Sequence, residues 1–303
     1  MKNNNRFEGI RGVCRQNESM ANHTSWRVGG TADLYYEPAD LEDLRLFLRK
    51  YSGTRPLLWL GLGSNILVRD GGYEGIVIAY SRALNLLEFP DPENVRVGAG
   101  TPCAKVAKET ARMGMTGAEF LAGIPGCMGG ALAMNAGAFG GVTWEIVSHV
   151  ETVDRNGDIR QRAASDFDIG YRSVQSDTEE WFITAKLHLK RNDADKSAEK
   201  IKSLLRKRSQ TQPTGIPSCG SVFRNPPGDH AARLIEECGL KGQRSGNACI
   251  SEKHSNFIIN LGGATSKDIE TLISTAKKAV LEKFGIELVT EVKIVGTTRH
   301  HEI

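Results

Sequence analysis

Residues 117–140 combine residue types that could hold a cofactor. The stretch reads GAEFLAGIPGCMGGALAMNAGAFG and is rich in glycine. An interior glycine costs a helix or strand about 0.5–1 kcal/mol relative to alanine, so this density needs a reason. Bare backbone can approach a flat or charged group closely and donate N–H groups to it. With Pro125 and Asn135, the stretch is a candidate cradle for a cofactor with a pyrophosphate, while a glycine-rich loop or a tight helix contact explains it equally well.

A second candidate is the turn Gly61-Leu62-Gly63-Ser64-Asn65, which lies between two apolar runs. It does not match GxGxxG, because position 66 is Ile, and the chain contains no GxxxxGK[ST] phosphate-binding loop. The turn can still present several N–H groups and a serine hydroxyl to a phosphate, as a backbone nest does. Taken alone, it is explained more simply as an ordinary hairpin turn.

Composition excludes several classes of function. The formal net charge is only +3, with Lys and Arg spread along the chain, so no nucleic-acid-binding surface is indicated. No apolar run reaches the length of a membrane span, and the first residues lack the apolar segment of a signal peptide. The six cysteines form no CxxC pair and no metal-like cluster with histidine. We therefore expect free thiols, no metal, a cytoplasmic setting, no nucleic-acid or membrane partner, and a monomer.

The elements around these stretches alternate between strands and helices, which predicts an α+β protein of two domains. Asp40 is expected to cap a helix that runs to residue 51, and Asp229 a helix that runs to residue 238. Thr265 begins the clearest helix, in which Asp268 completes a capping box and Gly285 marks the end. The other expected elements are a charged connector helix at 194–208 and strands at 57–60, 66–68, 75–80, 146–153, 181–189, 255–260 and 287–295.

Several motifs also coincide in chain order. They are NHTSWRVGGTADLYYEP, LGLGSNILVRDGGYEGIVI, the stretch at 117–140, GYRS, PSCGSVFRNPPG, GLKG and LVTEVKIVG. Together they closely resemble the UDP-N-acetylenolpyruvoylglucosamine reductases, flavoenzymes of peptidoglycan precursor synthesis. The resemblance extends over about residues 22–296, which is nearly the whole chain.

The resemblance implies an FAD-binding domain of the vanillyl-alcohol-oxidase (PCMH) type. This domain of two α+β subdomains would occupy residues 22–192, and a smaller α+β substrate-binding domain would occupy residues 193–303. NADPH would be the reductant of the FAD. The residues expected to bind FAD are Gly61, Gly63, Ser64, Asn65 and Ile66 at the pyrophosphate turn, and Gly123, Ile124, Pro125, Gly126, Gly129, Asn135 and Gly137 around the flavin.

The family reduces the enolpyruvyl double bond of UDP-N-acetylenolpyruvoylglucosamine to the lactyl ether of UDP-N-acetylmuramate. By resemblance, Ser221 would donate the proton, a task that suits a serine only beside a strongly basic enolate. Arg172 would pair with the substrate carboxylate, because a guanidinium stays charged and reaches two oxygens. Glu291, which interrupts an apolar run, would complete the charge-stabilising group. Further contacts to substrate are expected from Tyr171, Arg224 and Asn225.

Each of these residues also has an ordinary interpretation. Ser221 could be a plain turn hydroxyl, Arg172 a surface arginine after a glycine, and Glu291 the exposed side of an edge strand. The chain further departs from one subclass of the family, because it has no additional loop with a tyrosine after the flavin domain. It therefore resembles the short, loop-lacking subclass.

Two other functions remain open from the sequence. One is a different FAD-dependent oxidoreductase of the same fold that acts on a sugar or a hydroxy acid. Such enzymes often tether FAD through a histidine, and the turn around Ser64 has none. The other is a non-catalytic nucleotide-sugar binding protein, which would have no need of Arg172, Ser221 and Glu291.

Overall fold

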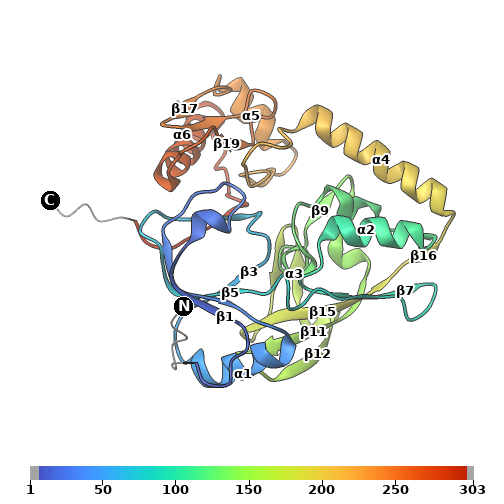
Figure 1. Ribbon diagram of the computed structural model, residues 1–303. Helices are drawn as coiled ribbons and strands as arrows, with labels where there is room; N and C mark the ends of the chain where they lie inside the picture. The colour runs from blue at the N-terminus through green and yellow to red at the C-terminus, as the bar shows by residue number, and fades with distance from the viewer. Residues whose placement is uncertain (1–6, 299–303) are drawn as a thin grey trace. The chain divides into compact units, whose positions relative to one another are not determined.

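The computed structural model describes residues 7–298. The chain separates into two compact units (Figure 1). Unit 1 contains the residues up to 16 together with 34–61 and 75–205, and unit 2 contains 17–33, 62–74 and the residues from 206 onward. Each unit is therefore assembled from segments that are far apart in the sequence. The domain boundary predicted between residues 192 and 193 stays a prediction.

Unit 1 contains most of the regular structure. Its helices are α1 (Leu41–Tyr51), α2 (Cys103–Arg112) and α3 (Met128–Ala133). Its strands are β3 (Leu57–Leu60), β6 (Leu87–Glu88), β7 (Asn94–Gly98), β8 (Met115–Thr116), β9 (Gly137–Ala138), β10 (Gly141–Val142), β11 (Val147–Asp154), β12 (Ile159–Ala163), β13 (Asp168–Gly170), β14 (Ser173–Gln175), β15 (Glu180–His188) and β16 (Lys190–Arg191). Four elements continue from the residues of one unit into those of the other: β1 (Val13–Ser19), β2 (Thr31–Glu37), β5 (Tyr73–Ala79) and α4 (Ala194–Thr211).

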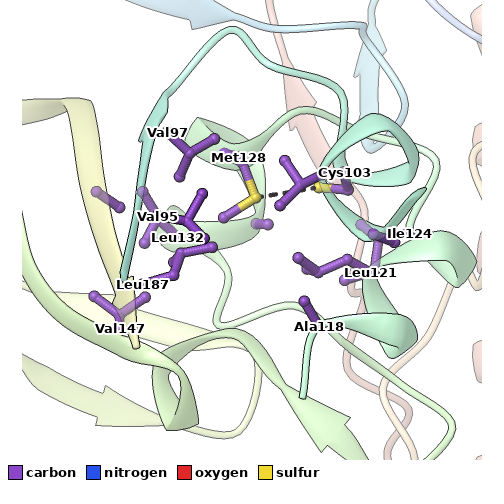
Figure 2. Close-up of a cluster of buried hydrophobic side chains, with 14 of the residues drawn as sticks. Val95, Val97, Cys103, Ala118, Leu121, Ile124, Met128, Leu132, Val147 and Leu187 are labelled. Atoms are coloured by element: carbon purple, nitrogen blue, oxygen red, sulfur yellow. Dashed lines mark hydrogen bonds between the residues drawn. The ribbon is translucent and has the colours of Figure 1, made fainter. Parts of the chain in front are cut away.

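A five-stranded antiparallel sheet with the order β12-β11-β15-β7-β6 forms the centre of unit 1. Along β7, the buried Val95 and Val97 alternate with the exposed Arg96, as a half-buried strand requires. Apolar side chains of β7, β11 and β15 meet side chains from α2 and α3 in one core, part of which is drawn in Figure 2. There Cys103 of α2 lies 3.9 Å from the sulfur of Met128, which begins α3. This packing fixes the start of α3, and with it the glycine-rich stretch on either side.

A second core of unit 1 forms around α1. Asp40 caps this helix by accepting a hydrogen bond from the N–H of Asp43, as expected. Leu44 and Phe47 are fully buried, and Phe47 stacks on Tyr36 with the ring centroids 3.8 Å apart. The caps and the apolar spacing of this helix are local signals, which is why the sequence predicts it within one residue.

Unit 2 contains β4 (Ile66–Val68), α5 (Ala231–Glu237), β17 (Arg244–Ser245), β18 (Ala248–Ile250), β19 (Ile258–Asn260), α6 (Ser266–Phe284) and β20 (Lys293–Val295). Thr265 and Asp268 form the predicted capping box of α6, and Gly285 ends the helix at φ +68°. Trp26 and Leu67 belong to the same core as the buried face of α6, although they precede it by about 200 residues. The strand β4 pairs in parallel with β20.

Two predicted elements of unit 2 are corrected by the structure. The helix expected from Asp229 begins at Ala231 without an aspartate cap, because Arg233 donates to the Asp229 carboxylate instead. The strand expected over residues 287–295 forms only at its end, where β4 offers a ladder partner. Before that point Thr290 makes a single bridge to Phe223.

Within residues 7–298, no helix has the length and apolar character to cross a membrane. The same residues contain no group of three or more His, Cys, Asp or Glu side chains that could hold a metal ion.

Candidate active site

Arg172 lies at the tip of a short hairpin formed by β13 and β14 in unit 1. Its backbone is left-handed at φ +55°, which a non-glycine residue adopts only when its surroundings hold it there. The guanidinium donates from Nη1 to the carbonyl of Asn135 at 3.3 Å and from Nη2 to that of Gly137 at 2.9 Å. The neighbouring Tyr171 is 54% exposed, and its ring centroid lies 5.1 Å from the Arg172 guanidinium carbon. The hairpin therefore presents an oriented arginine beside an accessible aromatic ring.

The base of this hairpin is held by a second arginine. Arg162 donates to the Asp166 carboxylate at 3.2 Å on one side of the hairpin and to Glu180 at 2.7 Å. Glu180 also accepts a 2.7 Å hydrogen bond from Ser176, which follows the hairpin. Burial alone would raise the pKa of Glu180, but the hydrogen bonds from Ser176 and Thr152 and the charge of Arg162 lower it. Both ends of the hairpin are thus tied to one half-buried carboxylate–guanidinium pair.

Asn135 joins the glycine-rich stretch to the hairpin. Its side-chain oxygen accepts the N–H of Trp144 at 3.1 Å, and its Nδ2 donates to the carbonyl of Gly170 at 3.1 Å. A Cβ at position 137 would come within 3.1 Å of Arg172 Nη1, so the glycine there gives the guanidinium room. The structure therefore brings Asn135, Gly137, Tyr171 and Arg172 together in unit 1.

Several glycines of the predicted flavin segments are required by protein packing. A Cβ at Gly123 would lie 2.5 Å from the ring of Phe139, and one at Gly129 would lie 2.7 Å from the Tyr80 hydroxyl oxygen. A Cβ at Gly61 would collide with the sulfur of Cys127. In the intervening loop Ile124 is buried, Pro125 is exposed, and the carbonyl of Gly126 accepts the N–H of Cys103 at 2.9 Å. The glycine density thus has a structural cause, and direct contact of these residues with FAD stays a prediction.

Ser221 and Glu291 belong to adjacent segments of unit 2. Ser221 is half-buried and follows Gly220, whose φ is +71°. The N–H of Glu291 donates to the carbonyl of Val222 at 2.8 Å, and Asn65 Nδ2 donates to the carbonyl of Glu291 at 3.2 Å. These contacts place the backbone of Glu291 next to the backbone that follows Ser221 and next to the end of the predicted pyrophosphate turn.

Asn256 is a structural residue of this site that the sequence analysis missed. It is 3% exposed, and its side chain both accepts the N–H of Phe223 at 2.9 Å and donates to the Phe223 carbonyl at 2.8 Å. Its own carbonyl accepts the N–H of Val222 at 2.9 Å. An asparagine inside the apolar run SNFIIN was the signal that could have indicated it, because a buried amide needs partners. It fixes the segment that carries Ser221.

Comparisons with known proteins identify the family of this chain. Residues 32–162 match a family model described as an FAD binding domain, and residues 212–295 match the C-terminal domain of UDP-N-acetylenolpyruvoylglucosamine reductase. The reductase of Methylococcus capsulatus is 55% identical over 286 residues, which cover 94% of each chain. The reductase of Legionella pneumophila is 51% identical and covers 94% of this chain and 93% of its own. The chain belongs to the UDP-N-acetylenolpyruvoylglucosamine reductase family.

A solved structure supports the same membership. The UDP-N-acetylenolpyruvylglucosamine reductase of Thermus caldophilus matches with a TM-score of 0.79 and 32% identity, over 94% of this chain and 98% of that one. The family predicted from the motifs is confirmed, and so are the α+β fold, the FAD-binding domain and the reductase activity.

The turn of this reductase at residues 62–65 fits the pyrophosphate of FAD. Gly63 has φ +63°, and a Cβ there would collide with the carbonyl of His23. Within residues 7–298, none of the backbone N–H groups of residues 62–65 donates to a protein acceptor. Successive N–H donors on a tight turn suit a phosphate, so the donor set matches the cofactor. Ser64 is half-buried beside them, whereas Ile66 is buried as the first residue of β4.

The two remaining substrate candidates differ in their surroundings. Arg224 is half-buried, and its N–H donates to the carbonyl of Val289 at 2.9 Å. Asn225 is exposed, but its side-chain oxygen accepts the N–H of Ala231 at 3.1 Å and so helps to begin α5. A role for Asn225 at the substrate diphosphate stays a prediction, and any such contact would have to coexist with this cap.

Proposed function

We propose that Arg172, Ser221 and Glu291 carry the enolpyruvyl reduction in this reductase. The chain is an FAD-dependent oxidoreductase of peptidoglycan precursor synthesis, with NADPH as the reductant and a nucleotide sugar as substrate. The observation that most directly supports the assignment is the hydrogen bond from Glu291 N–H to the Val222 carbonyl, which joins Glu291 to the residue that follows Ser221.

Bound FAD, once reduced by NADPH, would supply the hydride for the vinyl carbon of the substrate. Arg172 then has to hold the substrate carboxylate as enolate charge builds on it, and its planar guanidinium can reach two oxygens. Its two backbone carbonyl partners fix the plane of that group, so little reorganisation is needed when charge develops.

Ser221 donates its hydroxyl proton to the carbon next to the carboxylate. A serine hydroxyl is a weak acid, and it can act here because the enolate is strongly basic and held in place. Glu291 stabilises the same charge when it is protonated or hydrogen-bonded. The N–H of Glu291 donates to Val222 and its carbonyl accepts from Asn65, both within unit 2, so the backbone that carries this side chain is held in place.

We also propose that the protein acts as a monomer in the cytoplasm, without nucleic-acid or membrane partners. All six cysteines are free thiols, which suits a reducing compartment. Gel filtration with light scattering measures the molar mass in solution. The mass of a dimer at micromolar concentration would contradict the proposed monomer.

The decisive experiment is anaerobic and follows the visible absorbance of the flavin. The purified holoenzyme is reduced with NADPH, and UDP-N-acetylenolpyruvoylglucosamine is then added. We expect bleaching followed by rapid recovery without oxygen. Bleaching without recovery would assign the oxidative half-reaction to another acceptor, and a protein that binds no flavin would contradict the whole assignment.

A further inference from the structure

Both polar groups of the Asn135 side chain form hydrogen bonds within the protein. Its oxygen accepts from Trp144, and its nitrogen donates to the carbonyl of Gly170, the last residue before the hairpin tip. The residue is 8% exposed, so an unpaired amide here would cost about 1–3 kcal/mol. The amide therefore serves to connect two loops of unit 1.

The backbone conformation of Asn135 does not by itself require an asparagine. Its φ is +39°, a left-handed value that asparagine tolerates better than most residues. Glycine adopts such a conformation with no steric cost. If conformation were the only demand, glycine would serve here as well as it does at the neighbouring position 137.

The same residue also receives the catalytic arginine. Its carbonyl accepts from Arg172 Nη1 at 3.3 Å, while its Nδ2 holds Gly170, two residues before Arg172. The side chain and the backbone of Asn135 thus hold the hairpin at two points on either side of Tyr171. Loss of the amide would remove the hydrogen bond that holds Gly170, while the two carbonyls would still accept from the guanidinium.

We propose that Asn135 is a positioning residue for Arg172, and that its side-chain amide sets where the guanidinium meets the substrate carboxylate. This proposal rests on the function assigned to Arg172 above. It adds to the expectation that Asn135 lines the flavin, because the amide acts on substrate binding and enolate stabilisation. A displacement of about 1 Å in a group of this kind can slow a reaction about a hundredfold.

The test compares Asn135→Gly and Asn135→Asp, alone and combined with Arg172→Lys. Glycine keeps the left-handed backbone and removes the amide, whereas aspartate keeps the acceptor for Trp144 and loses the donor to Gly170. Asn17→Gly is the matched control, because Asn17 is exposed and also left-handed at φ +53°. Two quantities are measured on each holoenzyme: the rates of the two half-reactions, and the affinity for the product UDP-N-acetylmuramate by calorimetry.

We expect both Asn135 variants to weaken product binding about tenfold and to slow flavin reoxidation by substrate about 10–100-fold. Flavin reduction by NADPH should stay within about threefold, and Asn17→Gly should match the wild type. In the Arg172→Lys background the Asn135 substitutions should add little, because residues that act through one another are not additive.

Other outcomes overturn the proposal in distinct ways. Wild-type behaviour of Asn135→Gly, or full additivity with Arg172→Lys, would remove the positioning role and leave the function of Arg172 intact. Equal slowing of both half-reactions would assign Asn135 to cofactor contact instead. A normal rate for Arg172→Lys would remove the assigned function of Arg172 and this inference together.

Discussion

Ser221 is the residue proposed to donate the proton, and its environment is built by the backbone around it. Gly220 turns the chain at φ +71°, and the following peptide is tied to Asn256 and Glu291. Such ties fix the backbone next to Ser221, and a fixed backbone favours proton transfer to one carbon atom. A change confined to the hydroxyl should therefore affect chemistry much more than folding.

We expect Ser221→Ala to slow flavin reoxidation by the enolpyruvyl substrate about 10²–10⁴-fold, the usual contribution of a general acid. Flavin reduction by NADPH should be nearly unchanged, because no enolate is formed in that step. Stopped-flow absorbance measures both rates. Ser274→Ala, an exposed position on α6, is the control and should match the wild type. Normal reoxidation in Ser221→Ala would exclude this residue as the proton donor.

Asp43 gives unit 1 a pH-dependent stability. This buried carboxylate accepts hydrogen bonds from the Tyr36 hydroxyl at 2.6 Å and from the N–H groups of Arg11, Gly12 and Ala39 at 2.7–3.0 Å. Burial alone would raise the pKa of Asp43, but the hydrogen bonds outweigh it and lower the pKa below its ordinary value. Its stabilisation is therefore fully present above the unfolded-state pKa of about 3.9, and it is lost as the pH falls through the lower folded-state pKa.

Replacement of Asp43 by Asn should lower the free energy of unfolding by about 1–3 kcal/mol at pH 7, because the amide cannot accept all four hydrogen bonds. The difference from the wild type should shrink as the pH falls below about 4, where protonation removes the same charge. Urea unfolding followed by circular dichroism at several pH values measures this. Asp177→Asn, an exposed position, is the control. A difference that stays constant down to pH 2 would contradict the pKa argument.

At the scale of elements, α6 is the best-specified helix of the chain. The Oγ1 of Thr265 accepts the N–H of Asp268 at 3.1 Å, and the Asp268 carboxylate accepts the N–H of Thr265 at 2.9 Å. The buried face of the helix includes Ile269, Leu272 and Val280, which contribute to the core of unit 2. Local caps and tertiary packing therefore agree on the same bounds.

Loss of the cap should loosen the first turn of α6. Thr265→Ala should cost about 1 kcal/mol of stability, the usual value for an N-cap. Thr271→Ala is the matched control on the same helix: Thr271 is exposed in mid-helix, where alanine is the better helix former, so stability should be unchanged or slightly higher. Hydrogen exchange of the α6 amides, with thermal unfolding, distinguishes the two. Equal effects of both substitutions would mean that the capping box contributes nothing.

For the whole molecule, the structure predicts that the C-terminal part does not fold independently. The core of unit 2 includes Trp26 and Leu67, and β20 pairs with β4; Trp26, Leu67 and β4 all come from the first quarter of the chain. Trp26 also donates from Nε1 to the carbonyl of Ile258 at 2.7 Å. Deleting a buried tryptophan typically costs about 3–5 kcal/mol, which is comparable to the stability of a small domain.

A fragment of residues 193–303 should therefore lack a cooperative unfolding transition and show poorly dispersed amide signals by nuclear magnetic resonance. In the full chain, Trp26→Ala should destabilise unit 2 by about 3–5 kcal/mol. Val289→Ala, which removes an exposed side chain from the same unit, serves as the control. A fragment that folds cooperatively would instead support the contiguous division at residues 192 and 193.

The sequence by itself determined the family, the cofactor and the helices whose signals are local. The caps of α1 and α6 lie within three residues of their partners, so spacing alone predicts them. Short motifs of consecutive residues likewise indicate the turn at residues 62–65 and the segments around Arg172, Ser221 and Glu291. Local physics acts through neighbours along the chain, and the sequence shows those neighbours directly.

Only the tertiary structure decided which distant segments complete the site and the cores. The contact between Trp26 and Ile258 spans 232 positions, and the hydrogen bond from Asn65 to Glu291 spans 226. Asn135 was read from the sequence as a cofactor ligand, and only the folded chain places its amide between Trp144 and Gly170. A buried amide must find partners, but its identity does not specify which distant backbone groups they are. Those partners are set by the packing of the whole unit, where many weak contacts act together.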